Sequence, residues 1–468
     1  MFDLKKFENN IALVTESNQI SYSELDEISK KIGNAVGERC LIFLFAKNSV
    51  AAVGGYLGFV NKKIVPMMID AELNLELAKN LIEIYRPQFL WLPKNLRENY
   101  TDCAEIFQFE DYVLLSTQEK NPFELNDNLA LLMTTSGSTG SPKFVRQSYE
   151  NIFSNTKSIV EYLKLDEKSR AISNLPLNYV YGLSILNTHI FSGASVVLTE
   201  STLFQKEFWQ LMKEKEVTNF NGVPYTFSML EKLRFFRMKL PALETITQAG
   251  GKLDPELHFK FADYAAKNNK KFFVMYGAAE ATARMGYLPF EKSLEKCGSM
   301  GIAIPDGKFE LVDAEGKIIT APDTIGELIY YGNNVALGYA ESGKDLILGD
   351  ERNKRLETGD LAKFDSDGYF TIVGRKKRFL KMFGKRINLQ EVEHILRQHF
   401  DITEIACSGV DDKMIVFITE EKFLNEIVPY LSKKLNLHPA AFEVKVIANI
   451  PKNSSGKIIY SELENYSK

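Results

Sequence analysis

Short apolar runs and amphipathic runs alternate over most of this chain, and that alternation limits the folds open to it. Runs such as 41–45 (LIFLF) and 129–133 (LALLM) have the length and residue types of buried strands. Between the apolar runs lie segments such as 22–36, 73–84 and 204–215, where apolar residues recur at helical spacing. Further strand-like runs occupy 63–68, 171–173, 195–198, 245–249 and 271–276. Because strands that alternate with helices form largely parallel sheets, we expect an α/β fold.

A chain of 468 residues is too long for one hydrophobic core, so we expect more than one domain. From about Gly307 the pattern changes to shorter strands separated by turn sequences such as DAEG and DSDG. We therefore predict a large N-terminal domain of layered sheets and helices, residues 1–374, with a β-rich subdomain at about 307–374. A small α+β domain, residues 375–468, follows. Its predicted elements are helices at 390–399 and 423–434 and strands at 414–419 and 442–447.

Charge and cysteine content exclude several classes of protein. The net charge of -4, without a basic face, gives no reason to expect nucleic-acid binding. The four cysteines are scattered, which predicts reduced thiols and no zinc site. The apolar stretch 49–60 is too short to span a bilayer, and the first ten residues lack the apolar core of a signal peptide. We expect a cytoplasmic protein without a membrane span, in which 49–60 forms a buried helix.

The segment 131–143, LLMTTSGSTGSPK, indicates a phosphate-binding loop. Its glycines let the backbone approach an anion, its hydroxyls donate hydrogen bonds, and Lys143 adds a positive charge. It is not a Walker A loop, because Ser141 and Pro142 separate Gly140 from the lysine and an extended run, 144–146, follows instead of a helix. A flexible Ser/Thr/Gly linker is the alternative interpretation.

This loop resembles the nucleotide-binding signature of the adenylate-forming superfamily, which includes acyl-CoA synthetases, peptide-synthetase adenylation domains and luciferases. Five more segments resemble that family's motifs, in its order and spacing. They are QAGGKL (248–253), YGAAEAT (276–282), TGD (358–360), the hinge region (374–393) and PKNSSGK (451–457). The six segments are distributed between residues 131 and 457, so the resemblance extends over nearly the whole chain.

The resemblance implies that ATP and Mg²⁺ are bound, and it assigns nucleotide-binding residues. These are Thr134, Thr135, Ser136, Gly137, Ser138, Thr139, Gly140 and Lys143 in the loop, Ala249, Gly250 and Gly251 beside the adenine, Tyr276, Gly277 and Ala279, and Asp360 and Arg375 at the ribose.

It also assigns catalytic residues and a hinge. Lys457 would bind the substrate carboxylate and the α-phosphate, Glu280 would hold Mg²⁺, and Arg386 would contact the adenylate phosphate. Lys377 would be the pivot about which a mobile C-terminal domain rotates between two half-reactions. The plain alternatives are a solvated lysine at 457 and a purely structural turn at Asp360.

Three positions depart from the family pattern. Ala279 replaces a threonine, and Thr282 or Thr135 could supply the missing hydroxyl. Tyr179 stands where many relatives have another aromatic residue that gates the acyl pocket, so Tyr179 and Gly182 are candidates for that pocket; the alternative is that Tyr179 is a core residue. Tyr460 replaces a basic residue after the last motif.

The expected function is activation of a carboxylic acid to an acyl-adenylate with release of pyrophosphate, followed by transfer to a thiol. The segment 178–184 has no carboxylate to pair with an ammonium, which favours an acid without an amino group. The thiol could belong to CoA or to the phosphopantetheine of an acyl-carrier protein. Two alternatives stay open: an amino-acid adenylation or carrier-loading enzyme, and a degenerate nucleotide-binding protein without catalysis.

Overall fold

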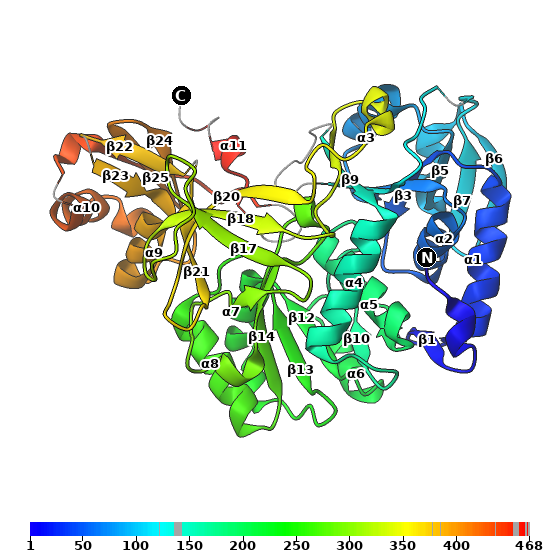
Figure 1. Cartoon of the computed structure of the whole chain (residues 1–468), viewed down its shortest axis with the longest axis horizontal. Helices are drawn as coiled ribbons and strands as arrows, with labels where there is room; N and C mark the ends of the chain where they lie inside the picture. Colours follow the sequence, from blue (N-terminus) through cyan, green and yellow to red (C-terminus); the bar gives the residue numbers. More distant parts are fainter. Residues whose placement is uncertain are drawn as a thin grey trace. The chain divides into compact units, whose positions relative to one another are not determined.

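Two large mixed sheets, of eight and nine strands, organise the first two thirds of the chain in the computed structural model (Figure 1). The structure describes residues 1–120, 122–134, 143–376, 378–383, 385–435, 437–452, 458–463 and 466. The chain divides into two units: the first comprises Met1–Phe309 and Tyr330–Leu356, and the second comprises Glu310–Ile329 and Glu357–Lys468.

The eight-stranded sheet has the order β19-β9-β8-β4-β3-β5-β7-β6. Its strands are β3 (Leu41–Ala46), β4 (Val65–Asp70), β5 (Phe89–Pro93), β6 (Ala104–Phe109), β7 (Tyr112–Ser116), β8 (Leu129–Thr134), β9 (Phe144–Ser148) and β19 (Gly338–Ala340). The central strands β5, β3, β4 and β8 run parallel, and the outer pairings are antiparallel.

The nine-stranded sheet has the order β16-β15-β14-β13-β12-β10-β11-β1-β2. Its strands are β1 (Ile11–Val14), β2 (Gln19–Ser21), β10 (Arg170–Ile172), β11 (Ser195–Val197), β12 (Asn219–Gly222), β13 (Thr245–Gln248), β14 (Lys271–Tyr276), β15 (Gly286–Leu288) and β16 (Ile302–Ala303). All pairings from β1 to β14 are parallel, so the carboxyl ends of β10, β12, β13 and β14 lie along one edge.

The helices of the first unit pack on the faces of these sheets. They are α1 (Tyr22–Val36), α2 (Val50–Asn61), α3 (Leu75–Tyr85), α4 (Tyr149–Leu163), α5 (Val180–Ser192), α6 (Lys206–Glu214), α7 (Pro224–Lys232) and α8 (Pro255–Lys267). Helix α1 begins where the Ser21 hydroxyl caps the first turn and Glu24 returns a bond to the Ser21 backbone.

All six residues of strand β3 are apolar and buried, because both faces of the strand are covered. Ile42 and Leu44 join a core that includes α1, α2 and α5, whereas Phe43 and Phe45 join a second core that includes α3. Because successive side chains point to opposite faces, a strand covered on both sides needs apolar residues at every position.

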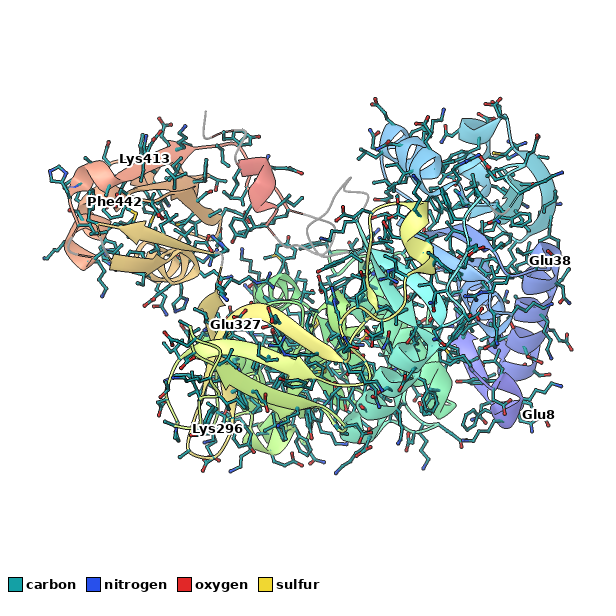
Figure 2. All side chains as sticks on the ribbon, turned by 45° about the horizontal axis from the view of Figure 1, so that its top comes forward. Glu8, Glu38, Lys296, Glu327, Lys413 and Phe442 are labelled. Atoms are coloured by element: carbon teal, nitrogen blue, oxygen red, sulfur yellow. The ribbon has the colours of Figure 1, made fainter. Side chains whose placement is uncertain are left out.

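A four-stranded sheet of order β17-β18-β20-β21 has residues in both units. Its strands are β17 (Lys308–Val312), β18 (Gly326–Tyr331), β20 (Arg355–Phe364) and β21 (Phe370–Arg375). Glu327 of β18 pairs with Lys376 at 2.6 Å, and Glu327 is labelled in Figure 2.

The rest of the second unit has its own core. It contains the hairpin β22 (Phe379–Met382) and β23 (Lys385–Asn388), helices α9 (Leu389–Phe400), α10 (Ile427–Leu435) and α11 (Tyr460–Leu463), and the sheet of β24 (Ile405–Val410), β25 (Lys413–Ile418) and β26 (Phe442–Val446). Among the residues that the structure describes, the two apolar clusters of this part consist of residues between Leu380 and Leu463. Lys413 and Phe442, both labelled in Figure 2, mark the first residues of β25 and β26.

Most of the predicted elements are confirmed. The α/β class and the small α+β C-terminal part are as expected, and 49–60 is a buried helix, α2. The helix predicted at 423–434 begins only at Ile427, because a short 3₁₀ turn precedes it. Strand β19 belongs to the eight-stranded sheet although its residues fall within the β-rich segment predicted at 307–374. The boundary predicted between 374 and 375 stays a prediction.

In the part of the chain that the structure describes, no helix is long and apolar enough to cross a membrane.

Candidate active site

Glu280 lies in the short turn Ala279–Ala281 that follows β14. Its carboxylate accepts a hydrogen bond from the Tyr339 hydroxyl at 2.8 Å. Its carbonyl oxygen accepts bonds from Ala336 N at 2.9 Å and Arg352 Nη1 at 3.1 Å. Burial, together with the negative charge of Glu280, raises the pKa of Tyr339 to about 12. The phenol therefore stays a donor at neutral pH and holds the carboxylate in place.

Tyr339 also brings two cations beside this carboxylate. Lys143 Nζ lies 3.9 Å from the centre of the Tyr339 ring, and Arg352 Cζ lies 4.5 Å from it. A cation over an aromatic face is attracted by the ring quadrupole. Lys143 also pairs with Glu341 at 3.5 Å. Lys143 and Glu280 thus both contact Tyr339, and the sequence analysis missed Tyr339 and Arg352; the roles of Lys143 and Glu280 stay predictions.

The donor set at Glu280 fits a hard divalent cation. Tyr339 engages one carboxylate oxygen, and the second oxygen has no hydrogen-bond partner among the described residues. Within that same part of the chain, no group of three or more His, Cys, Asp or Glu side chains could hold a metal ion. An ion such as Mg²⁺ would therefore take Glu280 as one ligand and obtain the others from water or phosphate oxygens.

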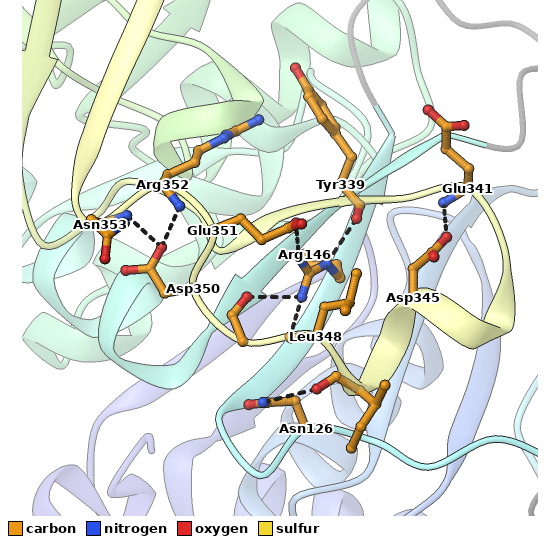
Figure 3. A network of polar contacts seen from close by, with 12 residues as sticks. Asn126, Arg146, Tyr339, Glu341, Asp345, Leu348, Asp350, Glu351, Arg352 and Asn353 are labelled. Carbon is orange, nitrogen blue, oxygen red and sulfur yellow. Dashed lines mark hydrogen bonds and ion pairs between the residues drawn. The ribbon is translucent and has the colours of Figure 1, made fainter.

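Arg146 on β9 fixes the segment that carries Tyr339 and Arg352 (Figure 3). Its guanidinium is fully buried and donates to the carbonyl oxygens of Tyr339 at 2.9 Å, Leu348 and Gly349, and to the Glu351 carboxylate. Strand β19 pairs directly with β9 at this point. Nothing in the spacing of the sequence reveals this contact, because about 190 residues separate Arg146 from Tyr339.

The predicted phosphate loop joins β8 to β9. Thr134 ends β8, and its hydroxyl donates to the Asn178 carbonyl at 3.4 Å. The run 144–146 is extended, as predicted, and begins β9. Six predicted nucleotide-binding residues lie outside the described part of the chain: Thr135, Ser136, Gly137, Ser138, Thr139 and Gly140.

The predicted adenine segment, Ala249 to Gly251, follows β13 at the carboxyl edge of the nine-stranded sheet. Gly250 has φ +85, and a Cβ there would lie 2.5 Å from the Tyr179 hydroxyl. Both the backbone conformation and the close approach require glycine at this position. The carbonyl of Gly251 accepts a bond from Gln248 Nε2 at 2.9 Å. Carboxyl edges of parallel strands are where open α/β sheets bind ligands.

Tyr276 ends β14, and Gly277 and Ala279 lie in the loop that follows it, with Ala279 buried. Thr282 was a candidate for the missing hydroxyl at Ala279. Its hydroxyl donates instead to the Asn334 carbonyl at 2.8 Å. Thr282 is thus engaged in fixing the loop, and Thr135 lies outside the described residues.

The two predicted acyl-pocket residues lie at the start of α5. Tyr179 packs edge-on against Tyr181 with ring centres 6.3 Å apart. A Cβ at Gly182 would lie 2.2 Å from the Pro176 carbonyl oxygen, so this glycine lets α5 pack against the preceding loop. A pocket-lining role for either residue stays a prediction.

The second unit contains the predicted ribose-binding pair. Arg375 Nε lies 2.9 Å from Asp360 Oδ1, and Asp360 is 5% exposed. The Thr358 hydroxyl accepts a bond from Asp360 N and donates to the Leu328 carbonyl, which fixes the turn. Asp360 and Arg375 therefore form an ion pair, and their predicted role at the ribose stays a prediction.

The remaining predicted residues lie in the C-terminal part. Lys457 and Lys377 are outside the described residues, and Arg386 belongs to β23 with its side chain likewise undescribed. Tyr460, where a basic residue was expected, lies against Arg378, whose Cζ is 3.6 Å from the ring centre.

A comparison with protein-family models matches residues 3–340 to the family described as AMP-binding enzyme. The chain belongs to the AMP-binding enzyme family. This confirms the resemblance to the adenylate-forming superfamily that the motifs indicated.

Characterised members of the AMP-binding enzyme family match along most of the chain. The 2-succinylbenzoate–CoA ligase of Listeria monocytogenes is 26% identical, and the match covers 98% of this chain and 97% of the relative. The oxalate–CoA ligase of Arabidopsis thaliana is 29% identical over 71% of this chain and 66% of the relative. The solved O-succinylbenzoate coenzyme A synthetase of Bacillus subtilis, in complex with ATP and magnesium ion, superposes with a TM-score of 0.79. It is 23% identical and covers 98% of both chains, which confirms the fold.

Proposed function

We propose that this chain is an AMP-forming acid–thiol ligase, which converts a carboxylic acid without an amino group to an acyl-adenylate and then to a thioester. The observation that carries the proposal is the group formed by Glu280, Tyr339, Lys143 and Arg352 in a member of the AMP-binding enzyme family. It places a carboxylate suited to Mg²⁺ beside two cations, which is what a triphosphate requires.

Each of the proposed residues has a part in the first half-reaction. Lys143 would bind phosphate oxygens, and Glu280 would hold the Mg²⁺ that neutralises them. Asp360 would accept hydrogen bonds from the ribose hydroxyls with Arg375 beside it. Lys457 and Arg386 would neutralise the charge that develops when the substrate carboxylate attacks the α-phosphate and pyrophosphate leaves.

CoA is the proposed acceptor, because the relatives that match most of this chain are CoA ligases. A carrier-protein phosphopantetheine is the alternative thiol. Neither 2-succinylbenzoate nor oxalate carries an amino group, which supports the same choice of acid here. A rotation of residues 375–468 about Lys377 would allow Lys457 to withdraw before the thiol enters.

The test measures pyrophosphate release from ATP over a panel of carboxylic and amino acids, with and without CoA. We expect release with at least one acid lacking an amino group, and thioester formation only when CoA is present. Lys457→Ala should slow adenylate formation by roughly 100-fold or more, the scale for removing a preorganised charge partner.

Release with amino acids alone would favour the adenylation-domain alternative. A failure to turn over any acid would favour a nucleotide-binding protein without catalysis. A Lys457→Ala variant as fast as the wild type would remove that lysine from the mechanism.

A further inference from the structure

Buried polar atoms without a hydrogen-bond partner gather at the carboxyl edge of the nine-stranded sheet. In the part of the chain that the structure describes, five such atoms belong to this region. They are Asn174 Oδ1, Asn178 Oδ1, Asn221 Nδ2, Gln248 Oε1 and Arg284 Nε. Folded proteins leave few buried polar groups unpaired, and a cluster of them indicates that a bound molecule supplies the partners.

Hydrogen bonds and a ring contact link Asn174, Asn221 and Arg284. Asn174 Nδ2 donates to the Asn221 carbonyl at 2.6 Å, and Thr247 Oγ1 donates to Asn221 Oδ1 at 2.7 Å. The Thr247 hydroxyl in turn lies 2.7 Å from the Tyr181 hydroxyl. Arg284 Cζ lies 3.9 Å from the centre of the Tyr181 ring. The guanidinium therefore stands beside the strand ends and beside the segment predicted to gate the acyl pocket.

The Arg284 backbone is held independently of its side chain. Asn155 accepts a bond from Arg284 N at 3.2 Å and donates to Arg284 O at 2.9 Å, and Asn334 Nδ2 donates to the same carbonyl at 2.8 Å. The side chain is almost fully buried, because the residue is 3% exposed. Its position is thus set by the fold before any ligand arrives.

The charge of Arg284 is not neutralised by the chain. The described residues offer it no carboxylate partner. Its Nη1 donates a long hydrogen bond, 3.4 Å, to the Ala283 carbonyl, and the neutral hydroxyls of Tyr162 and Tyr181 also interact with the guanidinium, while Nε has no partner among the same residues. The nearby tyrosines stay neutral phenols: burial raises the pKa of Tyr179 to about 12 and that of Tyr181 as well, and the Arg284 charge opposes this rise only in part.

A guanidinium keeps its proton in a protein, so it cannot escape the cost of burial by becoming neutral. Stacking on the neutral Tyr181 ring recovers only part of the free energy that is lost when an ion without a counter-charge is buried. A buried guanidinium that has only neutral partners among the described residues is therefore suited to bind an anion from another molecule.

We propose that Arg284 binds a second carboxylate of the acid substrate, so that the enzyme activates dicarboxylic acids. This inference rests on the proposed function, since it assigns the part of the acid that does not react. The guanidinium offers two parallel N–H donors that match the two oxygens of a carboxylate. Asn178 Oδ1 and Asn221 Nδ2, which have no hydrogen-bond partner among the described residues, are available at the same sheet edge for polar atoms of the substrate.

The same charge selects against amino acids. A substrate ammonium placed beside Arg284 would be repelled in a site of low polarity, where like charges cost several kcal/mol. The absence of a carboxylate from 178–184 and the presence of Arg284 therefore act in the same direction on substrate choice.

The test compares matched pairs of acids: butanoate with butanedioate, hexanoate with hexanedioate, and benzoate with benzene-1,2-dicarboxylate. For at least one of these pairs, the wild-type enzyme should show a kcat/KM for pyrophosphate release that is at least ~10-fold higher with the diacid than with the monoacid. Arg284→Met should lower the diacid kcat/KM by about 100-fold, mainly through KM, with the KM for ATP unchanged. Arg284→Lys, which keeps a charge without the two-pronged donor, should fall between them.

A control variant is Arg170→Met. Arg170 lies at the opposite, amino end of the same sheet, where it bonds Ser195 Oγ and the Lys215 carbonyl, and its loss should leave the ratio of diacid to monoacid unchanged. Thermal unfolding of the wild type without ATP provides a second measurement. The preferred diacid should raise the melting temperature and its monoacid should not, and Arg284→Met should abolish the difference.

The outcomes separate the two proposals. A wild type that uses every monoacid at least as well as its diacid overturns the role of Arg284 and leaves the ligase function standing. An equal loss for all acids in Arg284→Met, with a raised KM for ATP, would also overturn it. A diacid that stabilises the wild type but not Arg284→Met, without pyrophosphate release from any acid, would support the binding site and refute the ligase.

Discussion

Arg146 and Arg284 are both buried in the first unit, but their guanidinium groups have different kinds of partners within the fold. The guanidinium of Arg146 donates to three carbonyl oxygens and to the Glu351 carboxylate, whereas that of Arg284 has only neutral partners among the described residues: one carbonyl, two tyrosine hydroxyls and an aromatic face. A buried charge whose task is structural carries its own partners in the fold. One whose partners are missing has its task directed at another molecule.

The largest effect should come from replacing Arg146, because its guanidinium donates to three carbonyl oxygens and one carboxylate. Arg146→Met should lower the free energy of unfolding of the first unit by about 3 kcal/mol, the lower end for disrupting a buried ion pair, because Glu351 is half exposed and can be hydrated. Urea denaturation of wild type and variant measures the difference.

Arg86→Met is the matched control, because Arg86 forms a two-pronged ion pair with Glu119 at the surface. It should cost less than about 1 kcal/mol. A loss for Arg146→Met no greater than that of Arg86→Met would show that saturation of the buried charge contributes little.

The two most buried histidines, His189 and His258, also differ in their partners, and they make the stability of the fold depend on pH. Both ring nitrogens of His258 have partners, Ser293 Oγ and Gly298 N, whereas His189 Nε2 has none among the described residues. Burial lowers the pKa of each from 6.5 to about 4. The unfolded chain therefore binds more protons between these values, and stability is complete above pH 6.5 and falls as the pH drops toward 4.

At pH 4.5 each histidine should contribute a loss of about 2 kcal/mol in the free energy of unfolding. His258→Gln removes one titrating group and should make the stability of the variant less dependent on pH between 6.5 and 4.5. Unfolding curves at several pH values measure this slope. A slope identical to that of the wild type would contradict the assignment of His258.

The smallest effect concerns the hydroxyl that orients Glu280. Tyr339→Phe keeps the ring under Lys143 and Arg352 but removes the bond to the carboxylate, which is worth about 1 kcal/mol in a half-buried site. The Mg²⁺ concentration for half-maximal pyrophosphate release should rise about fivefold, with thermal stability nearly unchanged. An unchanged Mg²⁺ requirement would separate Tyr339 from the metal site.

Local patterns predicted the elements of the fold, because strand β3 and helices α1 and α2 are determined by the order of apolar residues over a few turns. The pairing of Asp360 with Arg375 was likewise accessible, since both residues lie in family motifs. Tyr339, Arg352 and Arg284 were not found. Their roles depend on contacts across long stretches of sequence, as between Glu280 and Tyr339, and on what is missing around a side chain, which no spacing records.

The backbone anchors of Arg284 have a consequence for how this enzyme can diversify. Asn155 and Asn334 hold the main chain of residue 284 whatever side chain it carries, and Glu280, four residues earlier, is aimed by a different neighbour, Tyr339. With the role proposed for Arg284, a substitution at position 284 would change the accepted acid while Glu280 keeps its orientation, so substrate choice and the proposed metal site could be altered separately.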